Sequence, residues 1–212
     1  MPRVARRAVV EGTAALARQA PEFAPYVDEH GPADLKRERP QRTHFAELAR
    51  AICFQQLAGA AARTIHGRFE ASLDGDVTPE GVLALPVETM RAAGLSAAKT
   101  ASIRDLAEKV LAGDVELDRM AKLSDDKIVE ELTLVRGIGR WTAEMFLMFN
   151  LLRPDIFPVG DLGLQKAVHV HYYNNEKIPL DKLREHGEAW RPWRSVATWY
   201  LWRSLDPVPV EY

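Results

Sequence analysis

Asp161 occupies a position where a helix start could hold its carboxylate in one orientation, and a carboxylate held in this way could take part in chemistry. It follows a Phe-Pro pair in the segment FPVGDLGLQKAV and precedes a stretch with helical spacing. As a helix N-cap, its carboxylate would accept a hydrogen bond from the backbone N–H of Gly163 or Leu164, which favours the ionised form. The residue therefore has two compatible interpretations, a cap and a fixed negative charge for chemistry. Asp155 is the competing acid, but it lacks the Phe-Pro lead and the helix start.

Two glycines two positions apart mark a second chemical feature, in the segment LTLVRGIGRWTAEMFLMF of residues 132–149. A helix leads in, Gly137 and Gly139 permit a tight turn, and a second helix leads out. Backbone N–H groups exposed in such a turn, beside a helix N-terminus, bind an anion without net protein charge. A plain helix–helix turn is the structural alternative.

The composition limits the class of protein and its partners. The chain has 212 residues, of which 47% are hydrophobic and 27% charged, as in soluble globular proteins. No apolar run approaches the ~20 residues of a membrane span, so we expect a cytoplasmic protein without membrane contact. A net charge of −2 disfavours broad electrostatic binding to nucleic acid but allows a local grip on a few phosphates. The single cysteine, Cys53, excludes a cysteine-ligated iron–sulfur cluster and is expected in the core.

Helical spacing recurs along the chain and strand signals are nearly absent. We therefore predict an all-α fold with roughly ten helices. Thr78, Ser96 and Ser124 are candidate helix caps. The helix after the hairpin should run from Arg140 to about Leu152, and the last helix from Arg191 to Ser204.

Two irregular stretches, residues 25–43 and 153–160, suggest the domain organisation. The segment 45–157 would form a central helical lobe that carries the hairpin. Residues 1–44 and 158–212 would pack together as a second helical lobe. We expect two helical lobes with a central cleft.

The hairpin LVRGIGRWTA followed by Asp161 resembles the helix-hairpin-helix (HhH-GPD) superfamily of DNA glycosylases. Over residues 45–205 the chain is similar to its 3-methyladenine DNA glycosylase II branch. The resemblance implies that Asp161 is the essential carboxylate and that the hairpin binds a DNA phosphate. The implied phosphate-binding residues are Arg136, Gly137, Gly139 and Arg140, and Arg136 departs from the proline common in the family. The hairpin carbonyls of Thr133, Val135 and Ile138 would hold an optional monovalent cation.

A fixed carboxylate suits the cleavage of an N-glycosidic bond, because positive charge builds on the sugar as the base departs. At about 4 Å and an effective dielectric of about 20, the charge pair gains about 4 kcal/mol. That modest gain suits a base that alkylation has already made cationic. Release of a neutral base would need an additional general acid, for which no residue is evident.

Trp141 predicts which nucleophile is used. In relatives similar to endonuclease III, a lysine at this position attacks the sugar and forms a Schiff base. Indole cannot do this, so the resemblance implies a monofunctional enzyme with water as nucleophile. Trp141 would stack on a flipped cationic base; packing in the core is the alternative. Met145, one helical turn later, and Trp202 would complete the base pocket.

Two further blocks match the same branch. In AICFQQLAGAAARTIHGRF, residues 51–69, Gln56 would wedge into the duplex with Gln55 and Leu57 beside it, unless these are only polar residues at a helix end. In the C-terminal helix, Arg194 would either reach a phosphate or pair with an internal acid. The segment GLSAAKTASIRDLA, 94–107, also matches a family helix, with an expected structural role.

We therefore predict a monomeric, nucleoid-associated DNA glycosylase that excises alkylated bases such as 3-methyladenine and 7-methylguanine from duplex DNA, and needs no cofactor. Three alternatives stay open. The protein could be a non-catalytic DNA-binding module, a glycosylase for mismatched or oxidised bases, or a bifunctional lyase.

Overall fold

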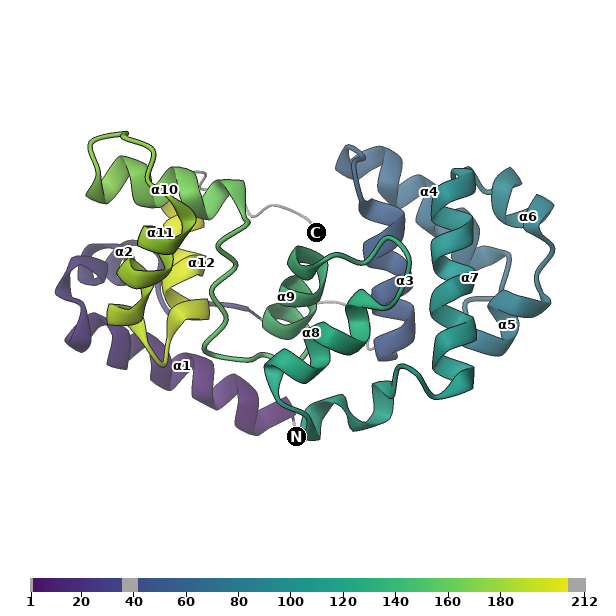
Figure 1. Cartoon of the computed structure of the whole chain (residues 1–212), viewed down its shortest axis with the longest axis horizontal. Helices are drawn as coiled ribbons and strands as arrows, with labels where there is room; N and C mark the ends of the chain where they lie inside the picture. Colours follow the sequence, from purple (N-terminus) through teal and green to yellow (C-terminus); the bar gives the residue numbers. More distant parts are fainter. Residues whose placement is uncertain (1, 36–41, 206–212) are drawn as a thin grey trace. The chain divides into compact units, whose positions relative to one another are not determined.

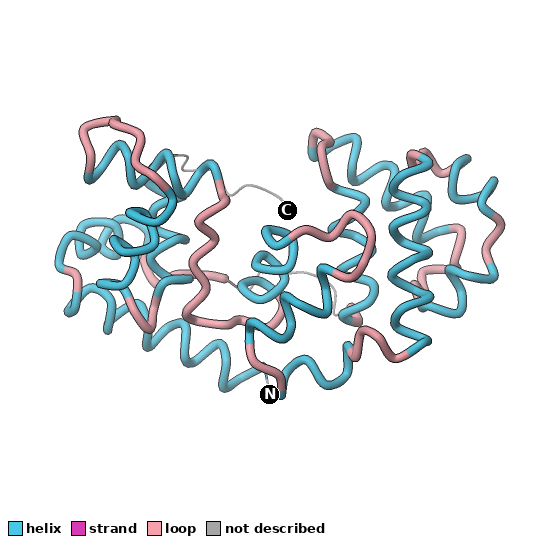
Figure 2. The backbone as a smooth tube through the Cα atoms, in the orientation of Figure 1, coloured by secondary structure: helices cyan, strands magenta, loops and turns pink. Residues whose placement is uncertain are grey.

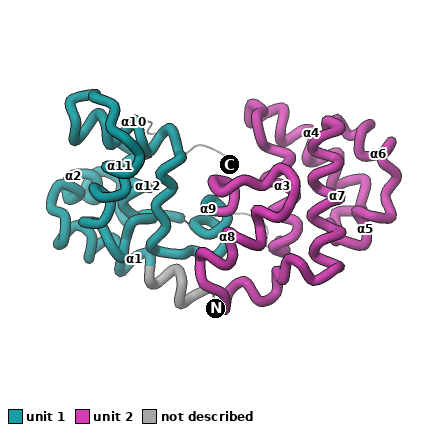
Figure 3. Tube along the Cα trace, viewed as in Figure 1, with its two compact units in different colours: residues 1–39, 144–210 teal, residues 40–143, 211–212 magenta. Residues whose placement is uncertain are grey.

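Every regular element that the structure describes is a helix, which confirms the all-α prediction (Figures 1 and 2). The computed structural model describes residues 2–35 and 42–205. In those ranges no helix combines the length and the apolar character needed to cross a membrane. The described residues fall into two compact units (Figure 3).

The first unit joins the two ends of the chain, residues 1–39 and 144–210. Its helices are α1 (Pro2–Gln19), α2 (Ala24–His30), α10 (Leu162–Tyr172), α11 (Leu180–Gly187) and α12 (Arg194–Leu205), with 3₁₀ turns at Pro21–Phe23 and Glu188–Trp190. Two long-range hydrogen bonds show why the ends belong together. The Tyr200 hydroxyl donates to the Gly31 carbonyl at 2.6 Å. The Gln19 side-chain amide donates to the Arg191 carbonyl at 2.7 Å.

The second unit takes its described residues from 42–143. Its helices are α3 (His44–Phe54), α4 (Gly59–Ala71), α5 (Pro79–Ala84), α6 (Val87–Ala92), α7 (Ala97–Ala112) and α8 (Asp125–Thr133), with a 3₁₀ helix at Leu117–Lys122. Helix α7 packs against both α3 and α5 (Figure 1). Its buried residues Ile103 and Leu106 are fully enclosed, as are Leu48 and Ile52 of α3. This apolar core makes α7 a firm support for the segments attached to it.

The division between the units falls inside α9 (Arg140–Phe149), between Ala143 and Glu144. The prediction also joins the two chain ends in one lobe, 1–44 with 158–212. It places the end of the central lobe, 45–157, at residue 157, whereas the structure places the end of the second unit at Ala143. The irregular segment 153–160 is a loop, as predicted, yet the buried apolar residues of α9 from Met145 to Met148 belong to the first unit.

Local helix signals are confirmed at three predicted caps. The side chains of Thr78, Ser96 and Ser124 each accept the backbone N–H of the third residue of the following helix. Two predicted bounds are wrong by a few residues. Helix α9 ends at Phe149, not near Leu152. Helix α12 begins at Arg194, because Pro192 disfavours helical conformation at Arg191.

The predicted connector at residues 25–43 needs a correction. Its first part is helical, in α2, while residues 36–41 lie outside the described residues. Helix α2 has no buried residue. It therefore lacks the apolar periodicity by which a helix is recognised from sequence.

Candidate functional site

The carboxylate of Asp161 is held by two N–H donors at the start of α10. As predicted, Asp161 is the N-cap, and its Oδ1 accepts the backbone N–H of Leu164 at 2.7 Å. The same oxygen accepts the indole N–H of Trp202 at 2.8 Å. The residue is only 6% exposed. Two donors on one oxygen restrict the orientation of the carboxylate and suit an anionic acceptor.

Trp202 therefore contacts the acid directly, which the sequence analysis missed. The two residues are 41 positions apart, so no local pattern could reveal the bond. The indole stacks on Phe149 of α9, with ring centroids 6.1 Å apart and an interplanar angle of 19°. This stacking fixes the ring that in turn fixes the carboxylate.

Gly163 makes room for this contact. A Cβ at this position would lie 3.1 Å from Cδ1 of Trp202 and 3.2 Å from Oδ1 of Asp161. Both distances are tighter than ordinary van der Waals contact, so a larger residue would push the donor and the acceptor apart. The requirement for glycine is thus close approach, a second feature that sequence reasoning did not find.

Asp155, the competing acid, has a different environment. Its carboxylate accepts from Nε of Arg194 at 2.7 Å and from a guanidinium nitrogen of Arg191 at 2.8 Å. Arg194 also donates to the Asp155 backbone carbonyl at 3.0 Å. This answers the question left open for Arg194, which pairs with an acid of its own unit. Asp155 is thereby committed to an ion-pair cluster.

The hairpin between α8 and α9 turns its apolar residues inward and its predicted anion-binding residues outward. Val135 and Ile138 are buried, and a turn bond runs from the Ile138 N–H to the Val135 carbonyl at 3.0 Å. Arg136, Gly137, Gly139 and Arg140 are all exposed. The predicted phosphate-binding residues therefore lie on one accessible turn.

The two hairpin glycines are not equivalent. Gly137 has a φ of +77°, and a Cβ there would lie 2.6 Å from Oγ of Ser102. Both the backbone conformation and the space demand glycine. A Cβ at Gly139 would meet nothing within 4 Å. The protein itself leaves open the space in front of Gly139.

The predicted wedge follows α3 and is attached to the hairpin. Gln56 and Leu57 are exposed, and Gln56 has a φ of 56°, in the left-handed region. Gln55 is half-buried, and its side-chain amide donates to the Gly137 carbonyl at 2.9 Å. Gln55 thus joins the wedge to the hairpin within the second unit.

The other predicted pocket residues lie on α9. Trp141 is half-buried in the first turn, and Met145, one turn later, is 6% exposed. Residues i and i+4 share a helix face, so these two side chains are neighbours along α9. Their contact with a base stays a prediction.

The predicted cation ligands are backbone carbonyls at the hairpin. The Val135 carbonyl already accepts one hydrogen bond, from Ile138, and keeps a second lone pair. The carbonyls of Thr133, Val135 and Ile138 are hard oxygen donors of the kind that alkali cations accept.

Cys53 is fully buried, and burial raises the pKa of its thiol to about 12, so it serves as an apolar core residue.

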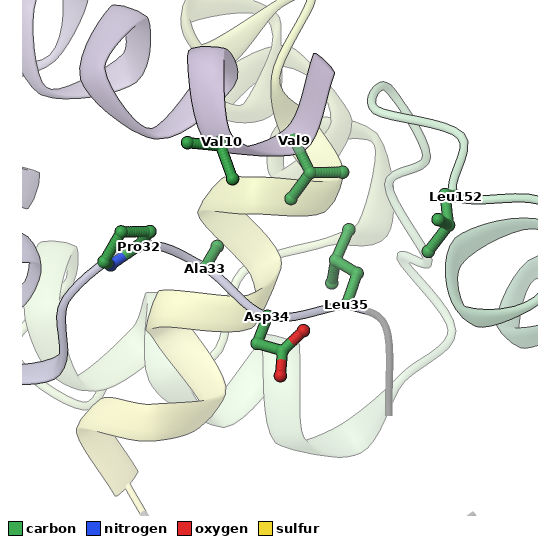
Figure 4. A pocket seen from close by; sticks show the side chains of 7 residues that line it. All are labelled: Val9, Val10, Pro32, Ala33, Asp34, Leu35 and Leu152. Carbon is green, nitrogen blue, oxygen red and sulfur yellow. The ribbon is translucent and has the colours of Figure 1, made fainter. Parts of the chain in front are cut away.

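A pocket of about 270 Å³ in the first unit has no part in this site (Figure 4). Its lining is Val9, Val10, Pro32, Ala33, Asp34, Leu35 and Leu152. Six of the seven side chains are apolar, and none is a predicted site residue. The pocket offers neither the carboxylate with fixed donors nor the exposed backbone N–H groups described above.

Helices are the only regular elements among the described residues, and the exposed Gly-x-Gly hairpin between two of them is typical of the class of helix-hairpin-helix proteins. Residues 49–192 match the family described as the HhH-GPD superfamily of base excision DNA repair proteins. The chain belongs to this family, as the resemblance of the hairpin predicted.

Named relatives and solved structures agree with this assignment. The chain is 37% identical over 172 residues to DNA-3-methyladenine glycosylase 1 of Schizosaccharomyces pombe, covering 79% of this chain and 75% of that protein. It is similar to the crystal structure of a DNA-3-methyladenine glycosidase from Bacillus halodurans, with a TM-score of 0.81 and 34% identity, covering 90% and 87% of the two chains. A 3-methyladenine DNA glycosylase of S. pombe in complex with abasic DNA gives a TM-score of 0.78 at 33% identity, covering 92% and 96%.

Proposed function

We propose that this protein is a monofunctional DNA glycosylase that releases alkylated bases, such as 3-methyladenine and 7-methylguanine, from duplex DNA in base excision repair. One observation carries the proposal: the Asp161 carboxylate is held in one orientation by the Leu164 N–H and the Trp202 indole N–H. The names of its relatives, DNA-3-methyladenine glycosylases, support the substrate class.

The reaction breaks the bond between C1′ of the sugar and the ring nitrogen of the base. The electron pair of that bond leaves with the alkylated base, which becomes neutral, while the sugar becomes cationic. The Asp161 carboxylate stabilises this cation and orients a water molecule. The water oxygen then bonds to C1′ and its proton is released to solvent. The products are a free base and an abasic site.

Trp141, Trp202 and Met145 are the residues that would contact the flipped base. The electron-rich indole of Trp141 attracts a cationic ring and cannot attack the sugar. Water therefore replaces the amine nucleophile of the lyases. This predicts that reduction with borohydride traps no covalent protein–DNA adduct.

The hairpin would bind one DNA phosphate through the backbone N–H groups at Gly137 and Gly139, close to the positive end of α9. The open space at Gly139 lets an anion approach the backbone. A monovalent cation on the carbonyls of Thr133, Val135 and Ile138 would add charge for the phosphate, and the chemistry requires no other cofactor. The protein's partner is then double-stranded DNA that contains a damaged base. A monomeric state and association with the nucleoid stay predictions.

A panel of duplexes, each with one defined lesion, tests this function. The wild type should release 3-methyladenine and 7-methylguanine faster than undamaged, mismatched or oxidised bases. Release of oxidised or mismatched bases alone would overturn the substrate class. Absence of release from every duplex would leave only a DNA-binding module and overturn the enzyme assignment.

A further inference from the structure

Helix α7 is hydrogen-bonded to both segments of the second unit that are predicted to contact DNA, the wedge and the hairpin. Near its N-terminus, Nζ of Lys99 donates to the carbonyl of Cys53 at 2.8 Å and to that of Gln55 at 2.7 Å, where α3 ends (Figure 1). Further along, Oδ2 of Asp105 accepts the backbone N–H of Arg136 in the hairpin at 2.7 Å. At 1.5 Å per residue, these two anchor points are about 9 Å apart along the helix axis.

Lys99 is placed to hold the base of the wedge. Carbonyls in the last turn of a helix lack intrahelical partners, and a cation there also interacts favourably with the helix dipole. The Gln55 carbonyl belongs to the peptide bond that leads into Gln56, whose φ of 56° is unfavourable for a residue with a Cβ. Such a conformation persists only where the surroundings hold it. The two bonds from Lys99 supply that constraint on one side.

Asp105 links α7 to the hairpin, and Gln55 links the wedge to the hairpin. The Asp105 carboxylate also accepts from Lys109, one turn along α7, which fixes its rotamer. The Gln55 amide donates to the carbonyl of Gly137, the residue that follows Arg136. Hairpin, wedge and α7 are therefore linked pairwise by hydrogen bonds. The rigid member is α7, whose Ile103 and Leu106 are fully buried.

We propose that Lys99 and Asp105 are positioning residues that hold the wedge at a fixed distance from the phosphate-binding hairpin. The inference rests on the proposed function and deepens it. With the spacing fixed, the phosphate bound at the hairpin determines the step of the duplex that the wedge enters. Flipping a paired base requires unpairing and unstacking, and a base that is already unpaired requires much less. A loosely held wedge should therefore impair the enzyme mainly where a paired base must be displaced.

The test compares two substrates in single-turnover base release. One duplex carries 7-methylguanine opposite cytosine, and the other carries the same lesion opposite an abasic analogue, where it has no pairing partner. Lys99→Met keeps the aliphatic chain and removes the donors. We expect its rate to fall at least about tenfold on the paired substrate and to stay within about twofold of wild type on the unpaired one. Lys99→Arg, which keeps donors, should retain most of the paired rate.

Matched variants separate positioning from stability. Lys127→Met removes an exposed lysine of the same unit and should match wild type on both substrates. Asp105→Leu, at the other anchor point, should show the same split as Lys99→Met. It keeps the test valid if Lys99→Met does not fold. Fluorescence of 2-aminopurine placed opposite the lesion reports flipping without chemistry, and its rise on binding should be lost in both variants.

Equal losses on the paired and unpaired substrates, or no loss on either, would overturn the positioning role while leaving the proposed function intact. Failure of the wild type to release the base from either duplex would instead overturn the proposed function, and this inference with it.

Discussion

Asp155 and Asp161 lie in one short stretch of the chain, yet the hydrogen-bond donors identified around them differ in charge. Asp155 is bound by the guanidinium groups of Arg191 and Arg194. The donors identified at Asp161 include two neutral N–H groups, from Leu164 and the Trp202 indole. A carboxylate paired with two cations has its charge largely neutralised, whereas a neutral N–H donor orients a carboxylate without adding an opposing charge. Asp155 therefore has a structural role in an ion-pair cluster, and Asp161 is the acid that we propose to stabilise a cation.

The largest expected effect is on the rate of base release, which should depend on Asp161 and not on Asp155. Asp161→Asn removes the charge but keeps a good N-cap, so the fold should be preserved. Losing about 4 kcal/mol of stabilisation lowers the single-turnover rate roughly a thousandfold. Asp155→Asn is the matched control and should stay within about threefold of wild type, a difference of only about 0.7 kcal/mol. A comparable loss in both variants would remove the distinction.

A smaller effect is expected from the donor that orients Asp161. Trp202→Phe keeps an aromatic ring against Phe149 but removes the indole N–H. A hydrogen bond to a charged group contributes about 1.5–3 kcal/mol, so base release should slow about tenfold or more. Trp199→Phe, in the same helix, is the control and should leave the rate nearly unchanged. Retention of the full rate by Trp202→Phe would mean that the indole N–H does not matter for the acid.

The cluster around Asp155 should matter for stability. Asp155→Asn leaves Arg194, whose side chain is 14% exposed, with Glu188 as its remaining acidic partner. We expect the free energy of unfolding in urea to fall by about 1–2 kcal/mol, less than for a fully buried pair because water screens the cluster. Asp161→Asn should change it by under about 0.5 kcal/mol. The reverse order of these two stabilities would contradict the assigned roles.

The smallest effect concerns the space beside Asp161. Gly163→Ala places a Cβ 3.1 Å from the Trp202 ring, which must shift by a few tenths of an ångström. Base release should slow about threefold, equivalent to about 0.7 kcal/mol. Gly160→Ala is the control, since a Cβ there meets nothing within 4 Å. An unchanged rate for Gly163→Ala would show that close approach at this position is not needed.

The parts of this structure that could be predicted from sequence depend on local interactions. Ser96, Ser124 and Asp161 cap helices because their partners lie three residues away, within the same turn. The hairpin could be recognised in the same way, since Gly137 must adopt a positive φ. Helix α2 could not, because it has no buried face to set an apolar period.

The contacts that distinguish the two acids are long-range. Trp202 reaches Asp161 across 41 positions, and Arg194 reaches Asp155 across 39. No spacing rule connects residues that only tertiary packing brings together. The candidate acid, Asp161, could therefore be predicted from the sequence, whereas the residues that surround it could be found only from the structure.

Affinity for a cationic analogue of the sugar tests the central claim most directly. A duplex with a pyrrolidine at the abasic position carries positive charge where the reaction develops it, and a tetrahydrofuran duplex is its neutral match. Wild type should bind the pyrrolidine duplex more tightly than the neutral duplex, and Asp161→Asn should lose that preference while binding the tetrahydrofuran duplex unchanged. An Asp161→Asn variant that keeps the full preference for the cationic duplex would contradict a role for this carboxylate in stabilising the sugar cation.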